Sequence, residues 1–400
     1  MKGALEGITV LDISQGWAGP GGTMLLAEQG AEVIKVEPPQ GDHGRYIFVD
    51  PPIKGEDRGF LAMNRSKRGI VLNLKDEEGK EILYRLFERS DVLVHNFRSG
   101  VPERLNIHYE KARAVNPRLI YVSLNAFGKK GPFAGQPAYD LVIQALAGAM
   151  HRQFPDGTPM DSGIWVSDCS SAIMLAYAVS LALLARERTG LGQHVEMALF
   201  NQTLIMQLPD LVRKEEELGG KKEAPLALLD YFSPYRCQDG KYIMQVALTN
   251  EQWKGLCWAL ELENLREDPR FDTPLKRAQN GKILHQELAA AFQKRPRNEW
   301  LEWLKKGDVP HAPVLSRDEV FRHPQTLENE MVVEINHPIT GPVKMLGIPF
   351  ELSETPGAIR GPSPLLGQHT REVLLELGYS EAEIETLGQQ GVIGMPANDE

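Results

Sequence analysis

Short apolar runs alternate with amphipathic stretches along the first half of the chain. Runs typical of buried strands cover residues 8–13, 31–36, 70–74, 91–95 and 119–124. Helix-like stretches separate them, including the amphipathic segments 77–87 and 109–115. This alternation continues to residue 199, so the pattern predicts an α/β domain with a mostly parallel sheet.

The first strand, a glycine-rich segment and the second strand together predict a right-handed βαβ unit. We expect Ala18-Gly19-Pro20-Gly21-Gly22 to form a turn before the helix-like TMLLAEQG. Glu37, near the end of the second strand, resembles the acid that binds ribose in dinucleotide folds. The fingerprint GxGxxG nevertheless lacks its third glycine, because Met24 stands there, so an NAD site is weakly supported.

The second half of the chain has a different pattern. A charged, glycine-broken stretch (KEEELGGKKE) predicts a boundary, and residues 231–246 read as strand, Asp-Gly turn and strand. Helical patterns follow over 251–262, 276–294, 297–306, 370–377 and 381–389, with short strands MVVEIN and PVKML between the third and fourth. We predict a large domain over 1–200, a linker over 201–225, a small α+β domain over 226–325 and a C-terminal segment over 326–400.

Composition is that of an ordinary globular protein, with 400 residues, 42% hydrophobic and 24% charged. The net charge of −10 disfavours nucleic acid and anionic membranes as partners, so an anionic ligand would need a local basic pocket. Three cysteines without a CxxC pair argue against disulfides and a metal cluster and favour the cytoplasm. The apolar run from Cys169 to Leu184 is shorter than the roughly 20 residues that span a bilayer, which predicts no membrane segment.

Asp168 is the candidate catalytic residue. It precedes a long uncharged run that ends before Gly190, so we expect it at or near the N-cap of a buried helix. The free N–H groups and the helix dipole there would lower its pKa and keep it ionised. The alternative is an acid that only caps the helix. Cys169 beside it reads as a small buried residue, since no activating histidine is visible.

Cations gather around the third predicted strand, at Arg65, Lys67, Arg68 and Lys75. These cations could form a rim that binds phosphate or a solvated basic loop, and composition alone does not decide between the two.

Several stretches in order resemble the class III CoA-transferases, the family that includes formyl-CoA transferase. They are VLDISQGWAGPGG, AEVIKVEPPQGDHGR, NRSKRGIVLNLKDEEGK, DVLVHNFRSGVPERL, NPRLIYVSLNAFGKKGP, PAYDLVIQALAGAM, the Asp168 segment ending in ARERTGLGQHVEMAL, YRCQDGKYI, DPRF, DVPHAPV, HPITGPVKMLGIPF and LGQHTREVLLELGY. Each motif is only moderately specific, but they cover nearly the whole chain.

The resemblance implies a Rossmann-like large domain completed by the C-terminal segment, a small domain between, and an interlocked homodimer. It implies that Asp168 is the nucleophile and that CoA is a substrate and product, with no tightly bound cofactor and no metal. Positions matching the family's CoA contacts are Ala18, Leu72, Lys75, Asn96, Phe97 and Arg104, with Arg98 following the Asn-Phe pair.

Two departures concern specificity. Pro38 stands where some relatives carry an arginine beside the adenine, and the glycine run of formyl-CoA transferase is absent from the 220–235 region. Formate or oxalate specificity is therefore not supported. The side chains expected around the acid are Gln15, Trp17, Tyr46 and Tyr139.

The function that follows is transfer of CoA from an acyl-CoA, such as succinyl-CoA, to a carboxylic acid through an aspartyl anhydride and an aspartyl-CoA thioester. An α-methylacyl-CoA racemase is the nearest alternative, but Tyr139 occupies the position of that enzyme's histidine, and a phenol is a poor proton shuttle at neutral pH. A non-catalytic CoA-binding protein is a second alternative, and an NAD-dependent dehydrogenase a distant third.

Overall fold

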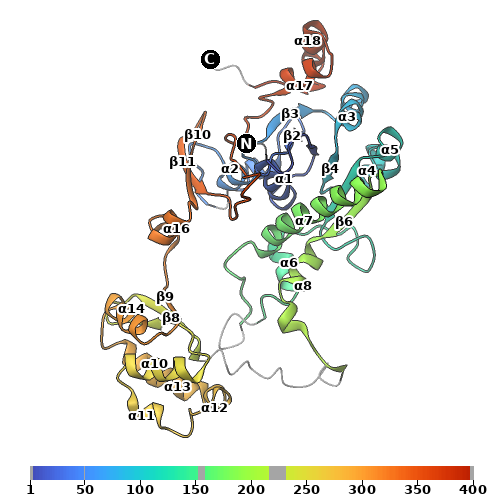
Figure 1. The fold of residues 1–400 in the computed structure, drawn as a ribbon. Coiled ribbons are helices and arrows are strands. Elements are labelled where there is room, and N and C mark those ends of the chain that lie inside the picture. The colour runs from blue at the N-terminus through green and yellow to red at the C-terminus, as the bar shows by residue number, and fades with distance from the viewer. Residues whose placement is uncertain (1–2, 49, 152–157, 216–230, 397–400) are drawn as a thin grey trace. The chain divides into compact units, whose positions relative to one another are not determined.

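The structure, a computed structural model, describes residues 3–48, 50–151, 158–215 and 231–396 (Figure 1). The chain divides into two compact units, one of residues 1–212 and 328–400 and the other of residues 213–327. Residues 216–225 of the predicted linker lie outside the described residues.

A seven-stranded sheet in the order β12-β3-β2-β1-β4-β5-β6 organises the larger unit. Its strands are β1 (Thr9–Asp12), β2 (Glu32–Glu37), β3 (Arg68–Leu72), β4 (Val92–His95), β5 (Ile120–Asn125), β6 (His194–Ala198) and β12 (Ile393–Gly394). Every pair is parallel except β12 on β3. The predicted parallel sheet is confirmed, and its strand order reverses between β1 and β4.

Helices cover both faces of this sheet, as the continuous buried runs of its strands require. On one face, Leu11, Ile34 and Leu93 pack in a core with α3 (Glu77–Arg89), α5 (Tyr109–Val115), α17 (Thr370–Glu376) and α18 (Glu381–Gln389). On the other face, Val10, Val33 and Val92 pack with α1 (Ala18–Glu28) and α7 (Val166–Thr189).

The glycine-rich segment is helical rather than a turn, because α1 begins at Ala18. Its glycines allow α1 to approach its neighbours closely. A Cβ added at Gly22 would lie 2.8 Å from Leu175 of α7, and one at Gly19 would lie 2.4 Å from the Ser14 hydroxyl. The sequence signal for a turn therefore reflects tight packing between α1 and α7.

Helix α7 is longer than the apolar run from which it was predicted. It spans 24 residues and ends at Gly190, whose φ of 72° is the left-handed cap expected there. By length and composition alone it could cross a membrane, a criterion that interior helices of water-soluble proteins also meet. The sequence argument from a short run is therefore wrong, although part of α7 is buried against the sheet.

The rest of the larger unit consists of short elements outside the seven-stranded sheet. They are η1 (His43–Arg45), α2 (Arg58–Met63), α4 (Val101–Arg104), α6 (Asp140–Leu146), α8 (Leu199–Ile205), η2 (Leu208–Leu211) and the antiparallel strands β10 (Val332–His337) and β11 (Gly341–Leu346). Helix α16 (Pro324–Glu328) belongs to the smaller unit except for its last residue.

The smaller unit has its own core around Trp253, Phe292 and Trp300. Its strands β7 (Tyr235–Arg236) and β8 (Tyr242–Gln245) form the predicted hairpin, and β9 (His311–Pro313) pairs with β8. Helices are α10 (Asn250–Ala259), α11 (Glu263–Arg266), α12 (Pro274–Gln279), α13 (Gly281–Phe292), α14 (Arg297–Lys306) and α15 (Arg317–Val320). The single helix predicted over 276–294 is two, separated at Asn280.

Candidate active site

A cavity of about 760 Å³ opens beside the carboxyl ends of β1 and β4, where the strand order reverses. Ligands of open α/β sheets bind at such switch points. The lining brings together segments far apart in the sequence, namely Gln15 to Ala18, Asn96 to Ser99, Leu124 to Phe127, Gly135 to Asp140, Trp165 and Asp168, with His43, Ile47, Val101 and Leu199.

Three buried or half-buried side chains hold the loop that follows β1. The Gln15 N–H donates to Asn96 Oδ1 at 2.9 Å, and Asn96 Nδ2 donates to the Gln15 carbonyl at 2.6 Å. The Gly16 N–H donates to Asp42 Oδ1 at 2.9 Å. Lys35 Nζ completes the set with 2.8 Å contacts to the Ser14 carbonyl and to Asp42 Oδ2. The loop carrying Gln15 and Trp17 is thus fixed before any ligand arrives.

Asp168 lies in the first turn of α7, as its third residue, and lines the cavity. Asp140, the first residue of α6, accepts hydrogen bonds from the backbone N–H groups at the start of α7. Its Oδ2 accepts the N–H groups of Ser167 at 2.8 Å and Asp168 at 2.9 Å. The capping role considered for Asp168 therefore belongs to Asp140.

This exchange of roles reverses the expected electrostatics. Burial and, as the second cause, the neighbouring Asp140 carboxylate together raise the pKa of Asp168 to about 7. The prediction of a lowered pKa is wrong, because the Asp168 carboxyl is buried and the N–H groups at the start of α7 donate to Asp140 instead. Asp168 is consequently a basic carboxylate in a cavity, an arrangement typical of functional acids.

Cys169 is exposed, not buried as expected. Although the residue is exposed, partial desolvation of the thiol raises the pKa of Cys169, and the charges of Asp168 and Asp140 act in the same direction. The sulfur therefore lacks the thiolate character of a nucleophile.

The cavity gathers most of the residues predicted for the site. Gln15, Trp17, Ala18, Asn96, Phe97, Arg98, Tyr139 and Asp168 all line it. The side-chain amide of Asn96, however, forms hydrogen bonds with the backbone of Gln15, so this side chain shapes the loop after β1.

Four predicted residues do not line the cavity: Tyr46, Leu72, Lys75 and Arg104. Leu72 is 1% exposed in the core, so its side chain offers no surface to a ligand. The Tyr46 hydroxyl donates to the Gln40 carbonyl. Lys75 and Arg104 are exposed, and no ion pair of either appears within the described ranges.

Three of the four cations of the basic cluster are bound by carboxylates and do not form a phosphate rim. Arg65 pairs with Glu28 at 2.6 Å and Lys67 with Asp12 at 2.9 Å, all four side chains being buried. Arg68 contacts the carboxylates of Glu32, Glu372 and Glu376. These partners lie far away in the sequence, so spacing alone gave no sign of them. Glu37 likewise is bound by Arg45 and is not a free acid for ribose.

Two lining residues were missed by the sequence reasoning. Asp140 was noted only for its tyrosine neighbour, because it lies 28 residues before Asp168 and no local pattern links the two acids. His43 packs on Gly16, and its Nδ1 lies 3.0 Å from Gln15 Oε1. Nothing in its local sequence distinguishes it from a surface histidine.

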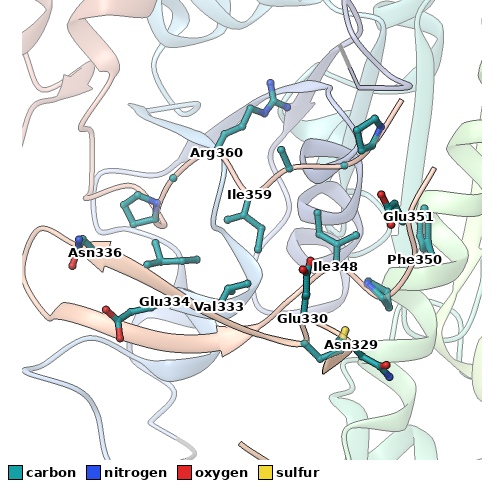
Figure 2. A pocket seen from close by; sticks show the side chains of 18 residues that line it. Asn329, Glu330, Val333, Glu334, Asn336, Ile348, Phe350, Glu351, Ile359 and Arg360 are labelled. Carbon is teal, nitrogen blue, oxygen red and sulfur yellow. The ribbon is translucent and has the colours of Figure 1, made fainter. Parts of the chain in front are cut away.

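A second cavity, of about 910 Å³, lies between β10 and residues 348–362 (Figure 2). Its polar lining consists largely of Glu330, Glu334, Glu351 and amides, while Arg360 donates to the Ala27 and Ala31 carbonyls. It contains none of the predicted site residues, so the site is assigned to the cavity of Asp168.

Comparisons with known proteins agree with this fold. Residues 5–370 match the model of CoA-transferase family III. The formyl-CoA:oxalate CoA-transferase of Streptomyces coelicolor is 34% identical, covering 98% of this chain and 99% of that protein. The succinyl-CoA:glutarate CoA-transferase of Mus musculus is 34% identical over 97% of this chain and 90% of its own length. A CAIB/BAIF family protein of Brucella suis superposes with a TM-score of 0.80 at 30% identity, covering 94% of this chain and all of that one (100%). The chain belongs to CoA-transferase family III.

Proposed function

We propose that this chain transfers CoA from an acyl-CoA donor, such as succinyl-CoA, to a carboxylic acid, with Asp168 as the nucleophile. The observation that carries the proposal is the placement of Asp168, a carboxylate with a pKa of about 7, in the switch-point cavity. Relatives named succinyl-CoA:glutarate and succinyl-CoA:mesaconate CoA-transferases support the donor.

The reaction needs four attacks and no metal or ATP. A carboxylate oxygen of Asp168 attacks the thioester carbonyl, the C–S bond breaks, and CoA thiolate leaves a mixed anhydride. The thiolate attacks the aspartyl carbonyl, which releases the donor acid and forms aspartyl-CoA. The acceptor carboxylate then displaces the thiolate, and the thiolate attacks the acceptor carbonyl of the new anhydride. Asp168 is returned as a carboxylate.

Each attack creates an oxyanion that needs a hydrogen-bond donor. The N–H groups of Ser167 and Asp168 donate to Asp140, so they are not available for this role. Gln15 lines the cavity, and its Oε1 lies against His43, which leaves its Nε2 group as a donor that could reach an oxyanion.

We also propose a cytoplasmic location, on the basis of the cysteine usage, and a homodimer. The homodimer is supported by an apolar stripe on α7 that the single chain leaves uncovered: Ile173, Tyr177, Leu181 and Leu184 are 60%, 57%, 47% and 53% exposed. Their spacing places them on one side of the helix. A second copy would bury this stripe, while the interlocking of the two chains stays a prediction from the family.

The test is a transfer assay with acyl-CoA donors and a panel of carboxylic acids, read by mass spectrometry. We expect new acyl-CoA products that require both substrates. Incubation of a 2-methylacyl-CoA in D2O examines the racemase alternative in the same experiment. Exchange of the α-proton without transfer to any acid would reject the proposal, and CoA binding without either reaction would favour a binding protein.

The rate should follow the ionisation of Asp168. Because burial and Asp140 hold its pKa at about 7, the nucleophile is lost as the pH falls below that value, and kcat/KM should rise with pH to a plateau above about 7. Asp140→Asn removes a negative charge, so we expect the midpoint to move to lower pH. Asp161→Asn, a change of an exposed acid before α7, should leave the profile in place. A wild-type midpoint near 4 would contradict this electrostatic account.

Lys75 is proposed to bind a CoA phosphate. It is exposed and outside the cavity, so Lys75→Ala should raise KM for acyl-CoA about 3- to 10-fold with little change in kcat, the size expected for one screened charge pair. Lys80→Ala is the matched control, because Lys80 already pairs with Glu77. Equal KM values in the two variants would return Lys75 to an ordinary surface role.

A further inference from the structure

Two tryptophans form one wall of the cavity that contains Asp168. Trp17 follows the loop after β1, and Trp165 immediately precedes α7. Their ring centroids are 5.1 Å apart with an interplanar angle of 83°, an edge-to-face contact. Both are half-buried and both line the cavity.

Both tryptophans are held in place by the backbone, and Trp165 lies three residues before Asp168 in the sequence. Trp165 is the N-cap residue of α7, so its backbone is fixed to the helix that carries Asp168. A Cβ added at Gly59 would lie 2.4 Å from the Trp17 ring, which shows that this indole packs on the backbone of α2. Trp17 Nε1 is buried there without a hydrogen-bond partner in the described part of the chain. The indole therefore acts as an apolar surface.

The charges of the cavity favour acids with a single carboxylate. Asp140 and Asp168 both line it, so a second carboxylate on the acid is repelled, and the same repulsion favours release of succinate from the donor over its retention. Within the described ranges, Arg98 is the one lysine or arginine of the lining, and it extends from the Asn96 to Ser99 segment that we assign to CoA. Arg45 nearby is bound to Glu37.

From these observations we infer that the preferred acceptor is a monocarboxylic acid with an aromatic ring, which packs against Trp17 and Trp165 while its carboxylate reaches Asp168. The inference rests on the proposed function and names the substrate class of the same cavity. The exposed Ile47 side chain lines the cavity as further apolar surface. A small donor such as succinyl-CoA leaves the wall partly uncovered, and an aryl acid fills it.

The test compares 3-phenylpropionate, butyrate and glutarate as acceptors with one donor, succinyl-CoA, and the full-length protein. We expect kcat/KM for 3-phenylpropionate to exceed that for each of the other two acids about 10-fold or more, since ring burial against an aromatic wall supplies the difference. In Trp17→Leu and Trp165→Leu, the ratio of 3-phenylpropionate to butyrate should fall about 10-fold.

The ratio separates recognition from a general loss of structure, which would lower both rates together. Trp258→Leu is the matched control, since Trp258 is 43% exposed in the smaller unit and packs on Trp303, so its ratio should equal that of the wild type. A preference for glutarate, or an unchanged ratio in both wall variants, would overturn the inference.

The failure of this inference differs from the failure of the proposed function. Succinyl-CoA alone should acylate Asp168, whichever acid accepts CoA afterwards. Acylation without a preference for the aryl acid overturns only the substrate class. Absence of both acylation and transfer overturns the function, and the inference with it.

Discussion

Asp168→Asn should abolish CoA transfer, lowering kcat by about 10⁴-fold or more, the order seen when a covalent nucleophile is removed. The fold should survive. Because burial and Asp140 raise the pKa of Asp168 to about 7, the folded state binds its proton more tightly than the unfolded chain does, and the contribution of Asp168 to stability falls as the pH rises from about 4 to 7.

An amide removes this cost, so the variant should unfold at a higher temperature than the wild type at pH 8, with a gain of about 1 kcal/mol or more. The two readouts together separate a nucleophile from a structural acid. Asp161→Asn provides the comparison, with activity and stability close to wild type. Retained turnover in Asp168→Asn would remove Asp168 from the mechanism, and a loss of stability would contradict the electrostatic account.

Lys67→Met should destabilise the protein by about 3–5 kcal/mol, the cost of leaving a buried charge without its partner. Both side chains of the Lys67–Asp12 pair are fully buried, and Lys67 Nζ also donates to Asn64 Oδ1 and the Pro20 carbonyl. Burial alone would raise the pKa of Asp12, but Lys67 and Lys35 lower it, so Asp12 is ionised in the core. In the variant, Asp12 loses its direct ion pair and keeps only the weaker electrostatic effect of Lys35.

The measurement is denaturant unfolding at pH 7, with Lys80→Met as the control. Lys80 forms a pair with the exposed Glu77, and such surface pairs contribute about 0–1 kcal/mol. Because Asp12 ends β1 directly before the cavity loop, we also expect Lys67→Met to lower activity in proportion to the folded fraction. Equal unfolding midpoints for the two variants would show that the buried pair contributes nothing specific.

Local patterns predicted the elements whose packing agrees with their sequence. The bounds of α5, α14 and α18 are those expected from their sequence patterns, and Ser380 caps α18 with its side chain. The hairpin of β7 and β8 followed from its Asp-Gly turn. The errors arose where segments that are distant in the sequence pack against each other. Glycines of α1 that face α7 were interpreted as a turn, because sequence does not show which helix lies against them.

The site was predicted in position more than in chemistry. Gln15, Asn96 and Asp168 were predicted for one site, and all three line one cavity. The strand order that creates the switch point at β1 and β4 was not predicted. The raised pKa of Asp168 could not be predicted from the sequence, because the N–H donors at the start of α7 bind Asp140, which lies 28 residues earlier. The buried ion pairs of Arg65 and Lys67 could not be predicted for the same reason, since their partners Glu28 and Asp12 are distant in the sequence.

The central claim is that Asp168 takes the acyl group or CoA onto itself. Incubation with succinyl-CoA, treatment with hydroxylamine and peptide mass spectrometry test it most directly, because hydroxylamine converts an anhydride or thioester of aspartate into a hydroxamate. We predict a hydroxamate on the peptide that contains Asp168, absent without acyl-CoA and absent in Asp168→Asn. Transfer activity with an unmodified Asp168, or a hydroxamate on another residue, would contradict the account.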